Sequence, residues 1–397
     1  MEPYRDMISV EQALEQVLAL VKPLSAEPVP LKNAVDRILA HPIIAHRDQP
    51  PFSASAMDGY AISGSDLRKG LKSWDVIGEA AAGHRFCKPV CTGQATRIFT
   101  GAPMPDGTNH VLIQEHVTEE SNYITISDEP NDKAHVRPAG GDFAVGYVLG
   151  AIRRLTPQDI ALIASMNTAM PMVTCKPKIA IIATGDELVQ PGETPRGDQI
   201  IASNTYGLAA MLQQVGAETR LLPIARDRLG SLEEVFKLAH GADLIITIGG
   251  ASEGDHDLVA QAADNFGMQQ SFYKVSMRPG KPLMAGKVGN IAMVSLPGNP
   301  VSAMVCGEVF VVPLIKKMLG LPSKPRSRLS GPLAIGLPAN GPREHYMRGK
   351  IIAGQIHVDP RQDSALLTVL NAANILIVHP ANAPAKSKGT LIEYIAL

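Results

Sequence analysis

Aromatic side chains and net charge are both scarce in this sequence. Phenylalanine, tryptophan and tyrosine make up 4% of its 397 residues, with a single tryptophan, and the formal net charge is −1. Such a balance does not provide the basic surface that nucleic-acid-binding proteins use, so we expect no nucleic-acid partner. Hydrophobic residues reach 45% and charged residues 19%, which is typical of a soluble globular protein.

Long apolar segments and targeting signals are also missing. The first residues, MEPYRDMISVEQ, lack the basic and apolar stretches of an export signal. The most apolar long stretch, 301–319, is interrupted by Glu308, Pro313, Lys316 and Lys317, so it does not predict a membrane span. We therefore expect a cytoplasmic protein with no membrane association.

Cysteine is rare, and its spacing does not indicate a metal site. The four cysteines are Cys87, Cys91, Cys175 and Cys306. Cys87 and Cys91 are four residues apart, without further His or Cys residues at the spacing that zinc sites require. This usage favours reduced structural thiols, as found in cytoplasmic proteins.

Glycine and proline are plentiful, with 35 and 31 residues that cluster at turns. They indicate many short loops, and the length predicts two to four domains. We predict an α/β multidomain fold with four parts: a helical linking and dimerisation domain (1–25 plus 145–176), an inserted mostly β domain (26–144), a central parallel α/β sheet domain (177–325) and a small C-terminal β-barrel-like domain (326–397).

Local signals mark several helices. Ser9 opens a first helix by a capping box, and Thr156 opens another at the far side of the inserted β domain. We expect these two helices to pack together, because the β domain is inserted between them. A short helix is also expected over 31–40, and one in the α/β part beginning at Ser231 with a capping box to Glu234.

Three apolar runs in the α/β part each end in a polar, glycine-containing turn. The runs IAIIA, LIITI and IAMVSL are followed by TGDE, GGASEGDHD and PGNP. Continuous apolar runs are typical of strands that are covered on both faces. Ligands of open α/β sheets bind outside the carboxyl ends of such strands. The sequence therefore predicts a site for a polar, anionic ligand held with a metal ion.

Acidic residues follow more than one of these runs. Asp186 and Glu187 follow the first, Asp227 follows the 221–225 run, and Asp257 lies after the second. Oxygen donors are the ligands that Mg²⁺ prefers, so these carboxylates are candidate metal ligands. Taken alone, Asp186 and Glu187 are better explained by a helix-capping aspartate beside a solvated glutamate, but the acids after the other runs favour a metal site.

Several carboxylates at one sheet edge repel one another unless positive charges lie nearby. The sequence offers such cations a short distance after Asp257. Lys274, Arg278 and Lys281 lie in the segment YKVSMRPGKP. Together with the glycines Gly249 and Gly250, they fit a phosphoryl or oxyanion centre. A solvated basic loop is the alternative. The sequence contains no Walker A motif and no GxGxxG.

Three loops of the inserted domain combine small residues with one polar residue at a bend. They are SASAMDGY with Asp58, TGAPMP with Thr100, and RPAGGD with Asp142. Because small residues let a backbone approach another group closely, we expect these loops to supply part of a cleft, completed by a sheet site on another subunit.

Taken in order, the segments SAMDGYA, TGAPMPDG, RPAGGDF, TGDEL, SN, GGASEGDHD, PGKP and LPGNPVS resemble the molybdopterin molybdenumtransferase family, bacterial MoeA and the gephyrin E-domain. The resemblance covers essentially the whole chain. It implies an enzyme that takes adenylylated molybdopterin, releases AMP and inserts molybdate with the help of Mg²⁺. It also implies a homodimer in which the inserted domain of one subunit covers the sheet edge of the other, with molybdopterin adenylyltransferase and other cofactor-pathway proteins as candidate partners.

The resemblance assigns roles to residues that match the family motifs. Catalytic roles fall to Glu187, Asp227, Asp257, Asp58 and Asp142. Substrate binding falls to Thr100, Lys274, Arg278, Pro297, Pro300, Gly249, Gly250 and Ser252. Metal binding falls to Asp186, Glu187, Asp227 and Asp257.

Departures from the family pattern leave alternatives open. Arg278 stands where lysine is common, Ala251 and Glu253 replace valines, and Ala202 stands where an acid is common. A tungstate-handling paralogue and a non-catalytic, gephyrin-like scaffold are the two alternatives to molybdate insertion. Adenylyltransferases and amidohydrolase relatives share the sheet-domain motifs, but they lack the loop SAMDGYA.

Overall fold

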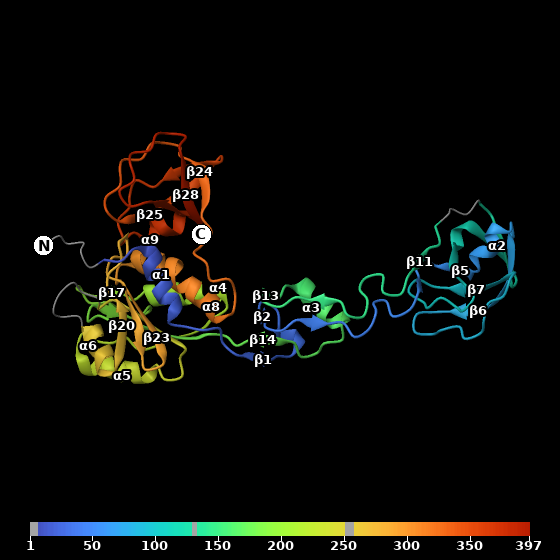
Figure 1. The fold of residues 1–397 in the computed structure, drawn as a ribbon, viewed down its shortest axis with the longest axis horizontal. Coiled ribbons are helices and arrows are strands. Elements are labelled where there is room, and N and C mark those ends of the chain that lie inside the picture. The colour runs from blue at the N-terminus through green and yellow to red at the C-terminus, as the bar shows by residue number, and fades with distance from the viewer. Residues whose placement is uncertain (1–6, 129–132, 251–257) are drawn as a thin grey trace. The chain divides into compact units, whose positions relative to one another are not determined.

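The computed structural model describes residues 7–128, 133–250 and 258–397. By their internal contacts they form two compact units. The sheet unit comprises Met1–Glu27, Asp36–Ala40 and Met172–Leu397, and the inserted unit comprises Pro28–Val35 and His41–Pro171. Each is described by itself (Figure 1).

The sheet unit is built on a six-stranded sheet in the order β18-β15-β19-β23-β22-β20. The strands are β15 (Lys178–Ala183), β18 (Glu218–Leu221), β19 (Leu244–Ile248), β20 (Met268–Phe272), β22 (Met284–Val288) and β23 (Ile291–Leu296). The three apolar runs are thus the adjacent strands β15, β19 and β23, and they pair in parallel as predicted.

The predicted parallel sheet has an antiparallel part at β22. This strand runs antiparallel to both of its neighbours. Only Gly289 and Asn290 separate β22 from β23, and Gly289 has a φ of 58°. A two-residue turn can join only antiparallel strands, because a parallel pair needs a long crossover.

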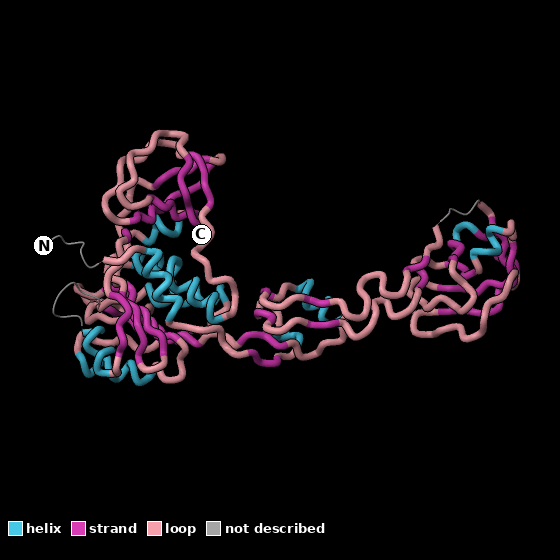
Figure 2. Tube along the Cα trace, viewed as in Figure 1, coloured by secondary structure: helices cyan, strands magenta, loops and turns pink. Residues whose placement is uncertain are grey.

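Helices cover both faces of this sheet (Figures 1 and 2). On one face, α5 (Leu229–Leu238) and α6 (Leu258–Asn265) pack against strand residues such as Ile182 and Ile245. The other face holds α4 (Asn204–Val215), α7 (Pro300–Cys306), the π-helical segment η3 (Gly307–Val311) and α8 (Val312–Met318). This three-layer arrangement explains why the strands carry continuous apolar runs.

The first helix, α1 (Val10–Ala19), belongs to the same core. It begins with the predicted capping box of Ser9 and Gln12, and it buries Val10, Ala13, Leu14 and Val17. These side chains share a hydrophobic cluster with α8 and η3. By these contacts α1 is part of the sheet unit, whereas the helix that we expected beside it, α3 (Pro157–Ser165), lies in the inserted unit.

Two local predictions fail. The segment 31–40 forms only a 3-10 turn, Leu31–Asn33, and the strand β2 (Ile38–Leu39), because Asp36 adopts a φ of 62° that a helix does not allow. Helix α5 begins at Leu229 rather than Ser231. The Ser231 hydroxyl accepts a hydrogen bond from the Arg226 N–H instead of capping the helix.

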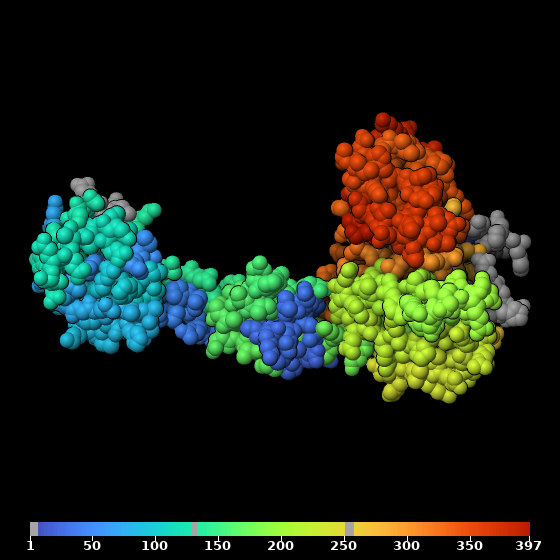
Figure 3. Space-filling view, turned by 180° about the vertical axis from the view of Figure 1, so that it is seen from behind, coloured from blue at the N-terminus to red at the C-terminus, as the bar shows by residue number. Residues whose placement is uncertain are grey.

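The C-terminal domain packs directly on the rest of the sheet unit (Figure 3). Its sheet has the order β21-β25-β27-β28-β24, with β26 paired to β25. The elements are β21 (Met277–Arg278), β24 (Leu329–Pro332), β25 (Glu344–Ile352), β26 (Gln355–Val358), α9 (Leu367–Ala372), β27 (Ile375–His379) and β28 (Leu391–Ala396). Strand β21 comes from the α/β part of the chain and pairs in parallel with β25.

The inserted unit is mostly β, as predicted (Figure 2). Its main sheet has the order β8-β5-β7-β6-β10-β9. The strands are β5 (Gly59–Ile62), β6 (Ser73–Ala80), β7 (Gln94–Ile98), β8 (His110–Ile113), β9 (Val117–Glu120) and β10 (Tyr123–Ile126). The buried Trp74 anchors this core and donates its indole N–H to Asp66 in α2 (Gly64–Arg68) at 3.2 Å.

Short strands complete the described structure: β1 (Ala26–Pro28), β3 (Ile43–Ile44), β4 (Ala54–Ser55), β11 (Val136–Arg137), β12 (Val148–Leu149), β13 (Arg153–Arg154), β14 (Met172–Thr174), β16 (Leu188–Val189) and β17 (Ile200–Ile201). In the part of the chain that the structure describes, none of the helices combines the length and apolar character that crossing a membrane requires.

Candidate functional site

A cavity of about 590 Å³ lies at the carboxyl ends of β15, β19 and β23. Thr184, Gly185 and Glu187 line it after β15, and Gly249 and Gly250 line it after β19. The turn 297–300 lines it after β23. Strand β15 has β18 on one side and β19 on the other, so the cavity opens where the strand order reverses. Open α/β sheets bind their ligands at this position, which the sequence predicted.

The two glycines after β19 let the backbone approach the end of β15. Gly249 and Gly250 have φ values of 92° and 70°, which favour glycine. A Cβ atom at Gly249 would lie 2.8 Å from the Thr184 carbonyl oxygen, and one at Gly250 would overlap the Val259 side chain. Any other residue type at either position would therefore clash with these neighbours.

The turn after β23 is held against helix α4. The Asn204 side chain donates to the Gly298 carbonyl oxygen at 2.7 Å. Pro297 is buried, and Pro300 occupies the first turn of α7. The predicted substrate-binding residues Gly249, Gly250, Pro297 and Pro300 therefore all line one cavity. Their contact with substrate stays a prediction.

Two of the predicted carboxylates face this cavity. Glu187 and Asp227 belong to its lining. Asp227 and Asp186 exchange backbone-to-carboxylate hydrogen bonds of 3.3 and 3.4 Å, which joins the loops after β15 and β18. Asp186 itself does not belong to the lining. The predicted Asp257 and Ser252 lie outside the described residues.

This arrangement is a partial donor set for Mg²⁺. Mg²⁺ binds through one or two carboxylates plus water and substrate oxygens rather than through a complete protein cage. Glu187 and Asp227 meet that requirement. Over the residues described, no group of three or more His, Cys, Asp or Glu side chains could hold a metal ion by itself. The residues present therefore fit a magnesium ion that shares its coordination with substrate.

Arg226 is a positioning residue that the sequence did not single out. Its Nη1 donates to the carbonyl oxygens of Asp186 and Leu188, both at 3.1 Å, and of Gly185 at 3.4 Å. One guanidinium thus fixes the loop that carries Glu187. In the sequence, Arg226 is recognisable only as a cation next to Asp227. No sequence pattern indicates which carbonyl groups its side chain contacts.

The predicted cations Lys274 and Arg278 are not among the residues that line the cavity in the described part of the chain. Arg278 is on β21, opposite His345 of β25. The Lys274 ammonium lies 5.4 Å from the ring centroid of Tyr273. Neither lines the cavity, whose described lining contains Glu187 and Asp227 but no lysine, arginine or histidine. A role for these two cations beside the acids stays a prediction.

In the inserted unit, Asp58 and Thr100 come together. Both the backbone N–H and the hydroxyl of Thr100 donate to the Asp58 carboxylate at 2.7 Å. These two hydrogen bonds lower the pKa of Asp58 below its ordinary value. Asp142 lines a separate cavity of about 690 Å³ with residues that include Phe52 and Arg137. Asp58 and Thr100 do not belong to that lining.

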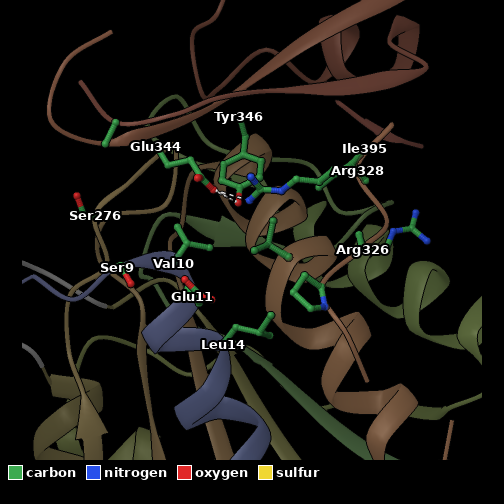
Figure 4. A pocket seen from close by; sticks show the side chains of 13 residues that line it. Ser9, Val10, Glu11, Leu14, Ser276, Arg326, Arg328, Glu344, Tyr346 and Ile395 are labelled. Atoms are coloured by element: carbon green, nitrogen blue, oxygen red, sulfur yellow. Dashed lines mark hydrogen bonds and ion pairs between the residues drawn. The ribbon is translucent and has the colours of Figure 1, made fainter. Parts of the chain in front are cut away.

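The sheet unit has another cavity, of about 490 Å³, between α1 and the C-terminal domain. Figure 4 shows Arg328 reaching Glu344 beside Tyr346, above Ser9 and Glu11 of the α1 terminus. Arg328 bonds to Glu344 at 3.0 Å, and the Tyr346 hydroxyl donates to the same carboxylate. Burial raises the pKa of Tyr346 well above its ordinary value. No residue of the predicted site belongs to this cavity, in which Arg328 and Glu344 form an ion pair.

Comparison with known proteins assigns the chain to a family. The MoeA N-terminal region (domains I and II) matches residues 8–167, the probable molybdopterin binding domain matches 180–317, and the MoeA C-terminal region (domain IV) matches 330–397. A Haemophilus influenzae molybdopterin molybdenumtransferase is 37% identical over 318 residues, covering 79% of this chain and 78% of that protein. This chain belongs to the molybdopterin molybdenumtransferase family.

Other members of the molybdopterin molybdenumtransferase family match over almost the full length. Molybdopterin molybdenumtransferase 2 of Mycobacterium tuberculosis is 31% identical over 400 residues, covering 98% of this chain and 99% of its own. A crystal structure of a molybdopterin biosynthesis MoeA protein from Pyrococcus horikoshii has a TM-score of 0.87 at 26% identity, covering 98% and 99% of the two chains. The resemblance that the motifs indicated is therefore confirmed, together with the multidomain fold.

Proposed function

We propose that this chain is a transferase of molybdenum cofactor biosynthesis that binds adenylylated molybdopterin, releases AMP and inserts molybdate in a Mg²⁺-dependent step. Family membership over nearly the whole chain supports the transferase activity. The observation that supports the position of the site is a cavity of about 590 Å³ at the carboxyl edge of the sheet, lined by Glu187 and Asp227.

The charge of this lining favours the dependence on Mg²⁺. Adenylylated molybdopterin and molybdate are anions, and the described lining contributes two carboxylates and no cationic side chain. Anions beside carboxylates repel each other unless a cation lies between them. When bound, Mg²⁺ would neutralise charge on the phosphoanhydride and on molybdate. Glu187 and Asp227 would hold it, and Arg226 would keep the Glu187 loop in place.

The turns around the cavity would bind and orient the substrate. Gly249 and Gly250 allow close approach to the backbone, and Pro297 and Pro300 border the same space. Backbone at such turns binds phosphate groups without requiring a charged side chain.

Release of AMP tests the reaction directly. The purified protein should release AMP from adenylylated molybdopterin when molybdate and Mg²⁺ are both present, and chelation with EDTA should reduce the rate at least tenfold. Added Mg²⁺ should restore it. A parallel reaction with tungstate measures the oxyanion preference. AMP release that persists in EDTA would contradict the Mg²⁺ dependence, and no release under any condition would favour a non-catalytic scaffold.

We also propose that the chain acts as a homodimer. The inserted unit has exposed apolar side chains at Val145, Val148 and Ile152, which are 63%, 52% and 57% exposed. Burying these apolar side chains against a second copy is favourable. Analytical ultracentrifugation should report twice the mass of one chain at micromolar concentration. A monomer under these conditions would contradict the proposal.

A further inference from the structure

Ile200 is an apolar residue that stays exposed although it lines the cavity at the sheet edge. It belongs to the short strand β17, and 58% of its surface is accessible. Single exposed hydrophobic side chains are common on protein surfaces. Of those that are large and exposed in the described ranges, however, only Ile200 and its neighbour Ile201, at 39%, belong to this lining. An apolar side chain that is accessible at a cavity is available to a ligand.

Leu188 lies beside Ile200 and adds to the same apolar surface. The two residues are Cα partners in the parallel pair of β16 and β17. Partner residues of paired strands have their side chains on the same face. Leu188 also belongs to the cavity lining. We call Leu188 and Ile200 together the apolar wall of the cavity.

The apolar wall adjoins the part of the cavity that carries Glu187. The Ile200 N–H donates to the Glu187 carbonyl oxygen at 2.8 Å, and Leu188 follows Glu187 in the chain. Arg226 donates to the Leu188 carbonyl oxygen at 3.1 Å. One fixed loop thus carries a carboxylate that would hold Mg²⁺ and, directly beside it, an apolar surface. A ligand with an anionic group and a flat ring a few bonds away matches this arrangement.

We propose that the apolar wall packs against the adenine ring of the adenylylated substrate. This inference rests on the proposed function and names the residues that recognise the leaving group. The adenylyl group joins a phosphate to a flat base through ribose, whereas molybdate has no apolar surface. AMP departs while the pterin part stays to receive molybdate, so the adenylyl group belongs on the accessible side of the cavity, where Ile200 lies. Covering the wall with the base removes apolar surface from water.

The experiment compares AMP with ribose 5-phosphate, which keeps the sugar and the phosphate but lacks the base. Isothermal titration calorimetry in the presence of Mg²⁺ measures the Kd of each ligand for the full chain. Ile200→Ala removes most of the side chain, and Ile200→Val keeps the branched shape. Ile352→Ala is the matched control, because Ile352 is 52% exposed and does not line the cavity. Thermal unfolding and analytical ultracentrifugation measure the Tm and the mass of each variant.

We expect Ile200→Ala to raise the Kd for AMP about tenfold, because the base loses the apolar surface that it would cover. The Kd for ribose 5-phosphate should change by less than about twofold, since this ligand does not reach the wall. Ile200→Val should keep most of the affinity for AMP, and Ile352→Ala should keep all of it. The Tm should stay unchanged in each variant, because the side chains are exposed.

Several results would overturn the contact. Ile200→Ala could bind AMP within about twofold of the wild type, or the wild type could bind AMP no better than ribose 5-phosphate. An affinity lost for metal-free molybdopterin but not for AMP would place the pterin ring at the wall instead. A lower mass of the Ile200→Ala protein would make Ile200 a contact between two copies.

The proposed function is tested separately from this contact. A wild-type protein that releases AMP from adenylylated molybdopterin keeps the proposed function, even if the Ile200 variants bind AMP normally. A wild-type protein that releases no AMP contradicts the proposed function, and the contact fails with it.

Discussion

Replacing Glu187 by glutamine should lower the rates of AMP release and molybdate insertion about a hundredfold or more. Glu187 is one of two carboxylates that line the cavity at the sheet edge. Glutamine has nearly the same shape but carries no charge, so the variant would keep the loop and lose half of the negative charge that would hold Mg²⁺. Because such a charge acts on the reacting groups, the loss should appear in kcat as well as in KM.

Glu234→Gln is the matched control for this prediction. Glu234 is an exposed glutamate on α5, outside the cavity lining. Its replacement makes the same chemical change and should leave both rates within about twofold. Rates are measured by AMP release and by activation of a molybdenum-free molybdoenzyme with the product. Full activity of Glu187→Gln would contradict the proposal that Glu187 takes part in the reaction.

Acidification from pH 7.5 to pH 5 should destabilise the sheet unit through His345. His345 on β25 lies opposite His379 on β27, and both imidazoles are buried. Burial, followed by the nearby charges of Arg278 and Arg348, lowers the pKa of His345 from 6.5 to about 4. The folded protein therefore keeps this imidazole neutral between pH 6.5 and 4, while the unfolded chain takes up a proton.

The sign of this effect follows from proton uptake by the unfolded chain. The stability contributed by neutral His345 is complete above about pH 6.5 and is lost as the pH falls toward 4. At pH 5 the free energy of unfolding should be lower by about 1–2 kcal/mol. Burial also lowers the pKa of His379, which acts in the same direction.

Urea unfolding at pH 7.5 and pH 5 measures this dependence. His345→Gln should reduce the difference between the two midpoints, because glutamine does not titrate. His357→Gln is the control, since His357 is exposed on β26 and should leave the difference unchanged. The assignment to His345 is wrong if both variants keep the wild-type difference.

The sequence predicted the position of the site well because backbone rules determine it. Apolar runs such as 179–183 are typical of strands covered on both faces. Parallel strands bring their carboxyl ends to one edge of the sheet. That is why Glu187, Gly249 and Pro297 were expected near one another, and they do line one cavity. The antiparallel β22 was missed, although the short Gly289-Asn290 connection to β23 could have indicated it.

Side-chain direction could not be predicted in the same way. The sequence did not indicate that Arg278 lies on a two-residue strand, β21, that pairs with the C-terminal domain. Ser231 looked like a helix cap, yet its hydroxyl accepts from Arg226. Arg226 holds the Glu187 loop through carbonyl groups that come near it only in the folded chain. No local pattern of residues contains that information.

The pairing of β21 with β25 has a consequence for protein engineering. The link 321–328 looks like a cleavable tether, but the two residues of β21, supplied by the α/β part of the chain, form one edge of the C-terminal sheet. If the two parts were separated at the link, the backbone groups of β21 and of β25 would both lose their hydrogen-bond partners. Chimeras between relatives should therefore exchange residues 277–278 together with the last seventy residues, as one piece.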